Sequence, residues 1–177
     1  MATGKTHQRI TKQLVIPSSI IVSYVLRDVV DLKTNLLYSI FIAFGILSGL
    51  FIHPDLDLLE TSIRSKLRTN NMFYKYWYIR WYKYSLIASH RGVISHSILL
   101  STLLRMLYIF PESALLFILI AKLLYFDQSA IFIFTLYIMW GVGLLISDLG
   151  HIMTDYIYSY TKKVKRGKQS NRSRRKN

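Results

Sequence analysis

The chain has 177 residues, of which 52% are hydrophobic, and its 23 lysines and arginines against 9 aspartates and glutamates give a net charge of +14. It has no cysteine, so disulfide bonds and thiolate metal sites are excluded, and a transition-metal site must use histidine, aspartate and glutamate. Apolar and basic residues occupy separate stretches, a pattern typical of a polytopic membrane protein and not of a soluble domain.

Five apolar runs follow one another along the chain: 14–26, 36–52, 93–110, 113–126 and 129–147. A membrane-spanning helix needs about 20 residues, with about 17 as the lower limit, so the second, third and fifth runs qualify. The first run is short and contains Pro17, and the fourth has only 14 residues and contains Lys122. In the second run Gly45 and Gly49 form a GxxxG pair, which indicates close helix packing.

Four polar motifs adjoin these runs: GKTH (4–7), HPDLD (53–57), SHRGVISHS (89–97) and DLGHIMTD (148–155). If the fourth apolar run does not cross the membrane, four crossings bring every motif to one side; a fifth crossing would place the last motif opposite. We therefore expect an all-α membrane bundle of about four transmembrane helices, formed by residues 1–158. Residues 113–126 would be a half-helix or an outer extension after Pro111 and Glu112.

The basic residues indicate which side carries the motifs. The segment between the second and third runs has no acidic residue after Glu60 and contains Arg64, Lys66, Arg68, Lys75, Arg80 and Lys83, and the tail from Lys162 to Lys176 holds nine more basic residues and no acid. Positive charge collects on the cytoplasmic face, so both termini and the motifs are predicted to lie on the cytoplasmic side of the cell (inner) membrane. The tail, 159–177, is basic and is therefore predicted to be disordered and to bind anionic lipid. Nucleic-acid binding is disfavoured because no folded recognition motif accompanies the tail.

The segment FYKYWYIRWYKY, residues 73–84, has eight aromatic residues out of twelve, interleaved with Lys75, Arg80 and Lys83. This composition predicts an interfacial segment, with rings at headgroup depth and cations near anionic lipid. An ordinary aromatic belt and a contact with a lipid-like substrate are both open interpretations.

The motif DLGHIMTD is the most informative about chemistry. On a helix, at about 100° per residue, Asp148, His151 and Asp155 fall within about 60° of one another. Carboxylates near a membrane are costly unless they are paired or bound to a metal, so this stripe predicts ligands of a divalent cation. The alternative is a helix end that turns polar where it reaches water.

The other motifs add donors of the same kind. In HPDLD, Asp55 and Asp57 would point the same way after Pro54, although an Asx-turn is an alternative. In SHRGVISHS, Gly92 permits a turn that would let His90 reach in from a loop while His96 projects from the next helix. Imidazoles and carboxylates together favour Zn²⁺, with Mn²⁺ and Fe²⁺ as alternatives, and Arg91 is suited to hold a phosphate.

TGKTH, PDLD, HRGVISHS and DLGHIMTD, in this order between apolar runs, resemble the motifs of the YdjM-like family of membrane-bound metal-dependent hydrolases, and within it a metal-binding membrane protein branch. The resemblance covers about residues 3–158, and Thr3 stands where the family has serine. The family is similar to the helical zinc-dependent phospholipase C and single-strand nuclease fold, which cleaves phosphoesters at a multi-zinc site. The resemblance implies more than one ion, Asp55 as a ligand or general base, and these ligands: His7, Asp57, His90, His96, Asp148, His151 and Asp155.

The favoured hypothesis is a membrane-bound hydrolase that uses metal-activated water on a phosphoester, such as a phospholipid or a lipid-linked phosphate. Asp55 would accept a proton and Arg91 would hold the phosphate. The alternative is a non-catalytic metal-binding membrane protein with a structural or regulatory role. Transport of an ion is a third hypothesis, disfavoured because no ionisable residue is expected at the middle of the long spans. The oligomeric state stays open.

Overall fold

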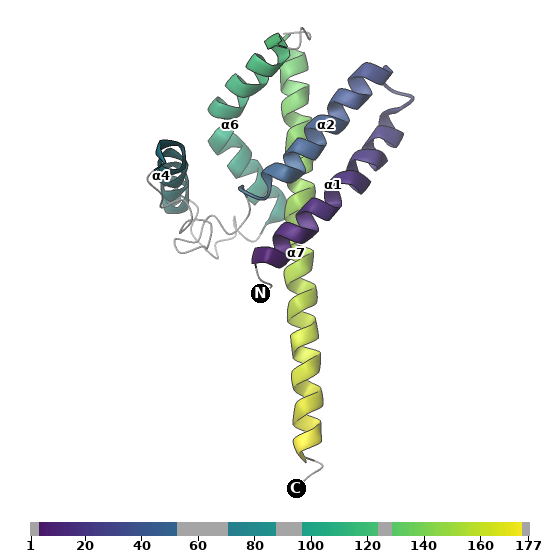
Figure 1. Ribbon diagram of the computed structural model, residues 1–177, viewed down its shortest axis with the longest axis vertical. Coiled ribbons are helices and arrows are strands. Elements are labelled where there is room, and N and C mark those ends of the chain that lie inside the picture. Colours follow the sequence, from purple (N-terminus) through teal and green to yellow (C-terminus); the bar gives the residue numbers. More distant parts are fainter. Residues whose placement is uncertain (1–3, 53–70, 88–96, 124–128, 175–177) are drawn as a thin grey trace.

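The structure is a computed structural model that describes residues 4–52, 71–87, 97–123 and 129–174 (Figure 1). The described residues form helices and no strand, which confirms the all-α class. The helices are α1 (Gly4–Leu26), α2 (Leu32–Ser48), α4 (Met72–Ile87), α6 (Ile98–Leu123) and α7 (Ala130–Arg174).

The helices alternate in direction. α1 and α2 form an antiparallel pair joined by a short turn, and α6 and α7 approach each other at that same end of the molecule (Figure 1). As a result, the start of α1, the end of α2 and the start of α6 all lie beside the middle of α7. This is the end of the bundle at which the sequence places its polar motifs.

The turn between α1 and α2 is fixed by a capping aspartate. The backbone N–H of Thr34 donates to Asp31 Oδ2 at 3.0 Å and its hydroxyl donates to Oδ1 at 2.6 Å. Both bonds stabilise the carboxylate, so they lower the pKa of Asp31 below its usual value. One turn later, the buried amide of Asn35 donates to the Ser23 carbonyl at 2.9 Å and ties α2 to α1.

Glycines bring α2 and α7 into backbone contact. A Cβ on Gly45 would lie 2.0 Å from the Trp140 carbonyl oxygen, and one on Gly143 would lie 2.1 Å from the Ile42 carbonyl oxygen. A Cβ on Gly49 would lie 2.0 Å from Ser147 Oγ. The close packing predicted from the GxxxG pair is therefore confirmed, and the partner surface is the glycine and serine face of α7.

An aromatic core joins α2, α6 and α7. Phe117 of α6 meets Phe41 of α2 edge to face at 5.0 Å between ring centroids, and it meets Trp140 of α7 at 6.0 Å. The buried Tyr137 donates its hydroxyl to the Met106 carbonyl at 2.6 Å, so its polar tip is satisfied inside the core.

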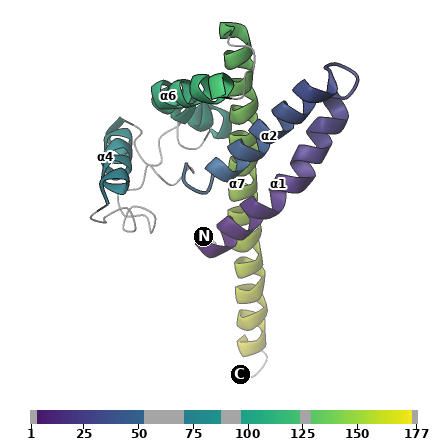
Figure 2. The same cartoon turned by 45° about the horizontal axis from the view of Figure 1, so that its top comes forward.

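Residues 113–123 are the second half of α6, which continues through Pro111 and is visibly bent (Figure 2). Proline lacks the N–H that would bond the previous turn, which explains a bend without a break. The fourth apolar run is thus attached to the third as an extension, one of the two forms predicted for it; its residues 124–126 lie outside the described part of the chain.

The aromatic helix α4 stands beside α6, away from the other helices (Figure 2). Trp81 and Tyr84 are buried against Tyr108 of α6, with ring centroids 5.9 and 5.1 Å from that ring. Arg80 forms an ion pair with Glu112 at 2.8 Å and donates to the Tyr108 carbonyl. One face of α4 therefore packs on protein, while the predicted interfacial role of this segment remains a prediction.

α7 is 45 residues long and continues through most of the tail predicted to be disordered, ending at Arg174. The physical reason is helix propagation: lysine, arginine and glutamine are good helix formers, no proline interrupts the tail, and the costly first turn already exists upstream.

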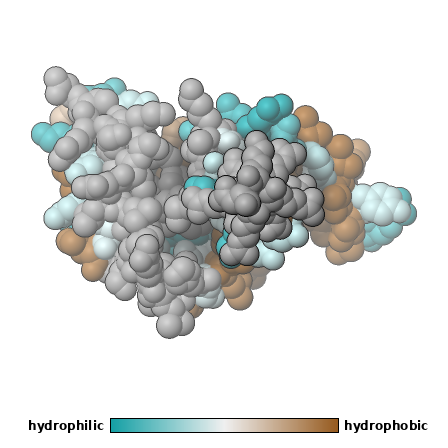
Figure 3. Space-filling view, turned by 90° about the horizontal axis from the view of Figure 1, so that it is seen from below, coloured by the Kyte–Doolittle hydropathy of each residue, from teal (hydrophilic) through white to brown (hydrophobic). Residues whose placement is uncertain are grey.

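Among the residues that the structure describes, two helices are long and apolar enough to cross a membrane: Ile98–Leu123 and the part of α7 spanning Ala130–Val164. α2 is also apolar but has only 17 residues. Large hydrophobic side chains are exposed on these helices, for example Leu115 at 70% and Ile131 at 81%. Hydrophobic areas reach the outer edge of the molecule seen from the end where α7 finishes (Figure 3). Length and composition therefore point to association with a membrane.

Candidate metal site

The first helix meets the middle of the last one at a small cluster of ligand-type side chains. His7 of α1 and His151 and Asp155 of α7 each offer one donor atom, and these atoms lie within 4.8 Å of one another. His7 Nε2 is 3.3 Å from Asp155 Oδ1, and His151 Nε2 is 3.9 Å from Asp155 Oδ2. We call these three residues the histidine cluster.

Local sequence explains why the cluster forms. His151 and Asp155 are four residues apart on one helix, so their side chains lie on the same face of α7. Just before them, Gly150 has no side chain, and a Cβ there would lie 2.5 Å from Leu14 Cδ1. The missing side chain lets α1 approach α7 closely, which places His7 beside His151.

The cluster is largely shielded from solvent. The histidine side chains are 10% and 9% exposed, whereas that of Asp155 is 24% exposed. The two imidazole rings stack with centroids 3.7 Å apart and an angle of 12° between their planes.

The donor set fits a divalent transition metal. Zinc binds imidazole nitrogen at about 2.0–2.1 Å and carboxylate oxygen at about 2.0–2.2 Å, which in a tetrahedron separates the donor atoms by roughly 3.3–3.5 Å. The 3.3 and 3.9 Å separations to Asp155 are close to that value. The two imidazole rings are stacked in nearly parallel planes, so a single ion cannot lie in both planes. One ring would have to turn for both histidines to bind the same ion.

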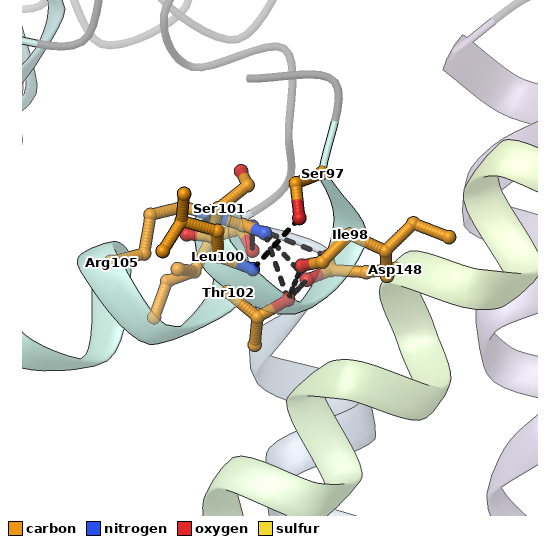
Figure 4. Close-up of polar contacts among 8 residues, drawn as sticks. Ser97, Ile98, Leu100, Ser101, Thr102, Arg105 and Asp148 are labelled. Atoms are coloured by element: carbon orange, nitrogen blue, oxygen red, sulfur yellow. Dashed lines mark hydrogen bonds and ion pairs between the residues drawn. The ribbon is translucent and has the colours of Figure 1, made fainter. Parts of the chain in front are cut away.

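Asp148, the third member of the predicted stripe, has a different partner. It is 1% exposed and forms a two-pronged ion pair with Arg105 of α6, at 2.5 Å between Nη2 and Oδ2 and 3.2 Å between Nη1 and Oδ1 (Figure 4). The hydroxyl of Thr102 also donates to Asp148 Oδ2. We call these three residues the arginine–aspartate cluster.

Arg105 also connects this cluster to the end of α2. Its Nη1 donates to the Ile52 carbonyl at 2.8 Å and its Nε donates to the Ser101 carbonyl at 3.2 Å. Every oxygen of Asp148 and every nitrogen of Arg105 therefore has a protein partner, as a buried ion pair requires.

The structure thus divides the predicted stripe: His151 and Asp155 meet His7, whereas Asp148 meets Arg105. Sequence reasoning overlooked Arg105, an ionisable residue within the third apolar run. The available signal was a lone arginine in the middle of residues 93–110, which needs an acidic partner and finds one in the last helix.

The remaining predicted site residues lie outside the described residues, and they stay predictions. They are the ligands and catalytic residues of the two middle motifs, namely Asp55, Asp57, His90, Arg91 and His96. Both motifs nevertheless adjoin described positions: Ile52 precedes the first, and Ser97 ends the second. The Ile52 carbonyl accepts from Arg105, and Ser97 is drawn close to Asp148 in Figure 4, so both positions lie near the arginine–aspartate cluster.

Comparison with known proteins gives one match. A family model described as "Uncharacterized metal-binding protein (DUF2227)" matches residues 2–165. Neither a curated protein nor a solved structure matches the chain at a significant level. The matched range includes all four polar motifs and all three members of the histidine cluster.

Proposed function

The chain belongs to this family of metal-binding proteins, and from that premise we propose that it is a membrane-bound, metal-dependent hydrolase whose ion is held by His7, His151 and Asp155. The observation that carries the proposal is the convergence of three donor atoms, from opposite ends of the chain, within 4.8 Å. Zn²⁺ suits two imidazoles and a carboxylate best, with Mn²⁺ and Fe²⁺ as alternatives.

Three protein ligands leave a coordination position open, which is the arrangement of a catalytic site and not of a closed structural one. A divalent metal bound there supplies Lewis acidity and makes a water molecule a nucleophile at neutral pH. Asp55, as general base, and Arg91, as phosphate ligand, would complete the chemistry of a phosphoesterase. Asp57, His90 and His96 are the proposed ligands of a second ion.

We propose a phospholipid or a lipid-linked phosphate as the substrate, because the exposed apolar helices suit a membrane. In this arrangement α1, α2, α6 and α7 each cross the bilayer, and the polar end of the bundle faces the cytoplasm. The basic end of α7, beginning at Lys162 and Lys163, would meet anionic headgroups there.

Metal content is the first test, because it does not depend on knowing the substrate. Detergent-purified protein should contain at least one transition-metal ion per chain by elemental analysis, and the double variant His7→Ala, His151→Ala should lose it. Asp28→Asn, an exposed carboxylate in the turn between α1 and α2, is the matched control. Wild-type protein purified without any metal and unable to take up Zn²⁺ would refute the proposal.

Hydrolysis is tested next on phosphodiester and phospholipid substrates, with chelator and then with added Zn²⁺. Activity that chelation abolishes and Zn²⁺ restores would support the enzyme. Full metal occupancy without hydrolysis of any phosphoester would favour the second candidate function, a structural role. One observation supports that candidate: the histidine cluster joins the first helix to the last, so an ion there would fasten α1 to α7. Chelation would then increase hydrogen exchange in α1.

A further inference from the structure

A cleft of about 520 Å³ lies among α2, α4, α6 and α7, on the side of the bundle that carries α4. Its volume is within the roughly 300–1,000 Å³ of small-molecule sites. Its wall is dominated by large apolar side chains, among them Phe44, Leu47, Phe51, Trp77, Leu116 and Phe117. Since α4 contributes Tyr74 and Trp77, this helix forms one side of the cleft.

The polar groups that α2, α6 and α7 contribute to the wall are already bonded within the protein. Ser48 Oγ donates to the Phe44 carbonyl and accepts from Trp140 Nε1 at 3.0 Å. Ser113 Oγ donates to the Ile109 carbonyl at 2.9 Å.

The one charged side chain of the wall is also paired. Glu112 forms an ion pair with Arg80 at 2.8 Å and accepts from the Tyr76 hydroxyl at 2.9 Å. A polar ligand that entered the cleft would lose its hydrogen bonds to water without gaining new ones, because these groups already bond within the protein. A hydrocarbon chain has no hydrogen bonds to lose. The chemistry of the wall therefore selects hydrocarbon.

The cleft runs along the bundle towards its polar end. Its wall follows the last turn of α2 from Phe44 to Ser48, about 6 Å at 1.5 Å per residue, and continues beyond the helix at Phe51 and Ile52. At its polar end, the Ile52 carbonyl accepts from Arg105, which pairs with Asp148 one helical turn before His151. The chain then enters the motif HPDLD directly after Ile52.

We infer that this cleft binds the acyl chain of a membrane phospholipid and holds its phosphate headgroup at the polar end of the bundle. The occupant is hydrocarbon at one end and anionic at the other. The cleft supplies the apolar surface, and at Ile52 it adjoins the charged residues Arg105 and Asp148. The headgroup part of this inference rests on the proposed function, whereas the acyl-chain part does not.

The test is native mass spectrometry of detergent-purified protein titrated with palmitoyl-oleoyl phosphatidylglycerol. Wild-type protein should bind one lipid at least about tenfold more tightly than the next. Leu116→Trp, which fills the cleft, should abolish this preference: affinity for the first lipid should fall at least about tenfold, or about 1.4 kcal/mol, because the added ring occupies the space of the acyl chain. Leu115→Trp adds the same side chain to the neighbouring position, which is 70% exposed and outside the cleft, and should bind like wild type.

Equal binding by the two variants, or no preferred first lipid in the wild type, would overturn the inference. If Leu116→Trp does not fold, Leu47→Trp tests the same cleft from α2. His151→Ala separates this inference from the proposed function: it should lose metal and keep the preferred lipid. If Leu116→Trp loses the lipid preference but keeps its metal, the result supports binding of the acyl chain in the cleft. Absence of hydrolysis in the wild type would refute only the proposed enzymatic activity.

Discussion

Two polar clusters lie one helical turn apart on α7 and differ in how their charges are satisfied. In the arginine–aspartate cluster, Asp148 is 1% exposed and is bonded by Arg105 and Thr102. In the histidine cluster, Asp155 is 24% exposed and faces two stacked imidazoles. The first cluster brings its own cation, whereas the second gathers donor atoms of the kind that bind one.

This difference teaches which aspartate on a polar stripe is structural. A buried carboxylate with a fixed guanidinium has no need of a metal, because the pair neutralises itself and its bonds are complete. A carboxylate beside imidazoles belongs to a set of donors that a divalent transition metal binds. The same stripe of α7 thus holds a buried ion pair at Asp148 and a candidate metal site at His151 and Asp155.

The largest effect is expected from Arg105→Met, which leaves the carboxylate of Asp148 buried without its cation. Breaking a buried pair in this way costs about 3–5 kcal/mol of unfolding free energy. Thermal unfolding in detergent, followed by circular dichroism, measures the loss. The double variant Arg105→Met, Asp148→Leu should recover most of it, because no charge is then left unpaired.

An Arg105→Met variant as stable as the wild type would contradict the assignment of Arg105 as the partner of Asp148, since it would mean that another cation neutralises this carboxylate. Metal content tests the same assignment independently of stability. The double variant should keep its metal, whereas loss of the ion together with Asp148 would place that residue among the ligands.

The next effect concerns the histidine cluster and is expected in metal affinity. His151→Ala or Asp155→Asn removes a direct ligand, so affinity for Zn²⁺ should fall by more than the roughly 10–100-fold that loss of an outer partner costs. Metal-free wild type and variants should unfold at nearly the same temperature. If the metal-free variants were much less stable than the metal-free wild type, the histidine cluster would have a structural role like that of the arginine–aspartate cluster.

A smaller effect is expected where α2 presses against α7. Gly45→Ala places a methyl group against the Trp140 carbonyl and pushes away the helix whose end delivers the Ile52 carbonyl to Arg105. Overpacking costs about 1–3 kcal/mol, reduced by the roughly 1 kcal/mol that alanine gains over glycine in a helix.

Gly141→Ala is the matched control for this crossing, because its new methyl group meets only the flexible end of the Met106 side chain. It should be neutral or slightly stabilising. A comparable loss in both variants would show that the effect is not specific to the contact between the two helices.

The smallest effect on stability is expected at Asp31, which lies far from both clusters. The pKa of Asp31 is lowered in the folded protein by its bonds from Thr34, so its contribution to stability is present above the unfolded pKa and is lost as pH falls through the folded pKa. Asp31→Asn keeps a capping side chain and should remove this acid sensitivity, whereas Asp31→Ala should lower the unfolding temperature slightly at every pH. Equal acid sensitivity in wild type and Asp31→Asn would contradict this account.

Much of the helical architecture could be predicted from apolar runs alone, because a long apolar run has few alternatives to a helix. The runs 36–52 and 129–147 correspond to α2 and to the start of α7, and the pair Gly45 and Gly49 correctly predicted close packing of α2, although not that its partner is α7. The grouping of His7 with His151 and Asp155 also agrees with the predicted convergence of the end motifs.

Other features depend on three-dimensional information that a single sequence does not contain. Helical spacing places Asp148 on the stripe of His151, but only the packing of α6 brings Arg105 to one of them and not to the other. Pro111 left two forms open for the fourth apolar run, a half-helix or an extension, and only the structure shows that one helix continues through the proline. The helical continuation of α7 was missed because charge density was taken to favour disorder over helix propagation.

The position of His7 in the first helix and His151 in the last sets an order of events during biosynthesis. A ribosome must complete nearly the whole described chain, and the final helix must dock against the first, before these donors come together. The nascent protein therefore lacks this three-donor pocket through most of its translation, and capture of an ion there can mark the moment at which the bundle has closed.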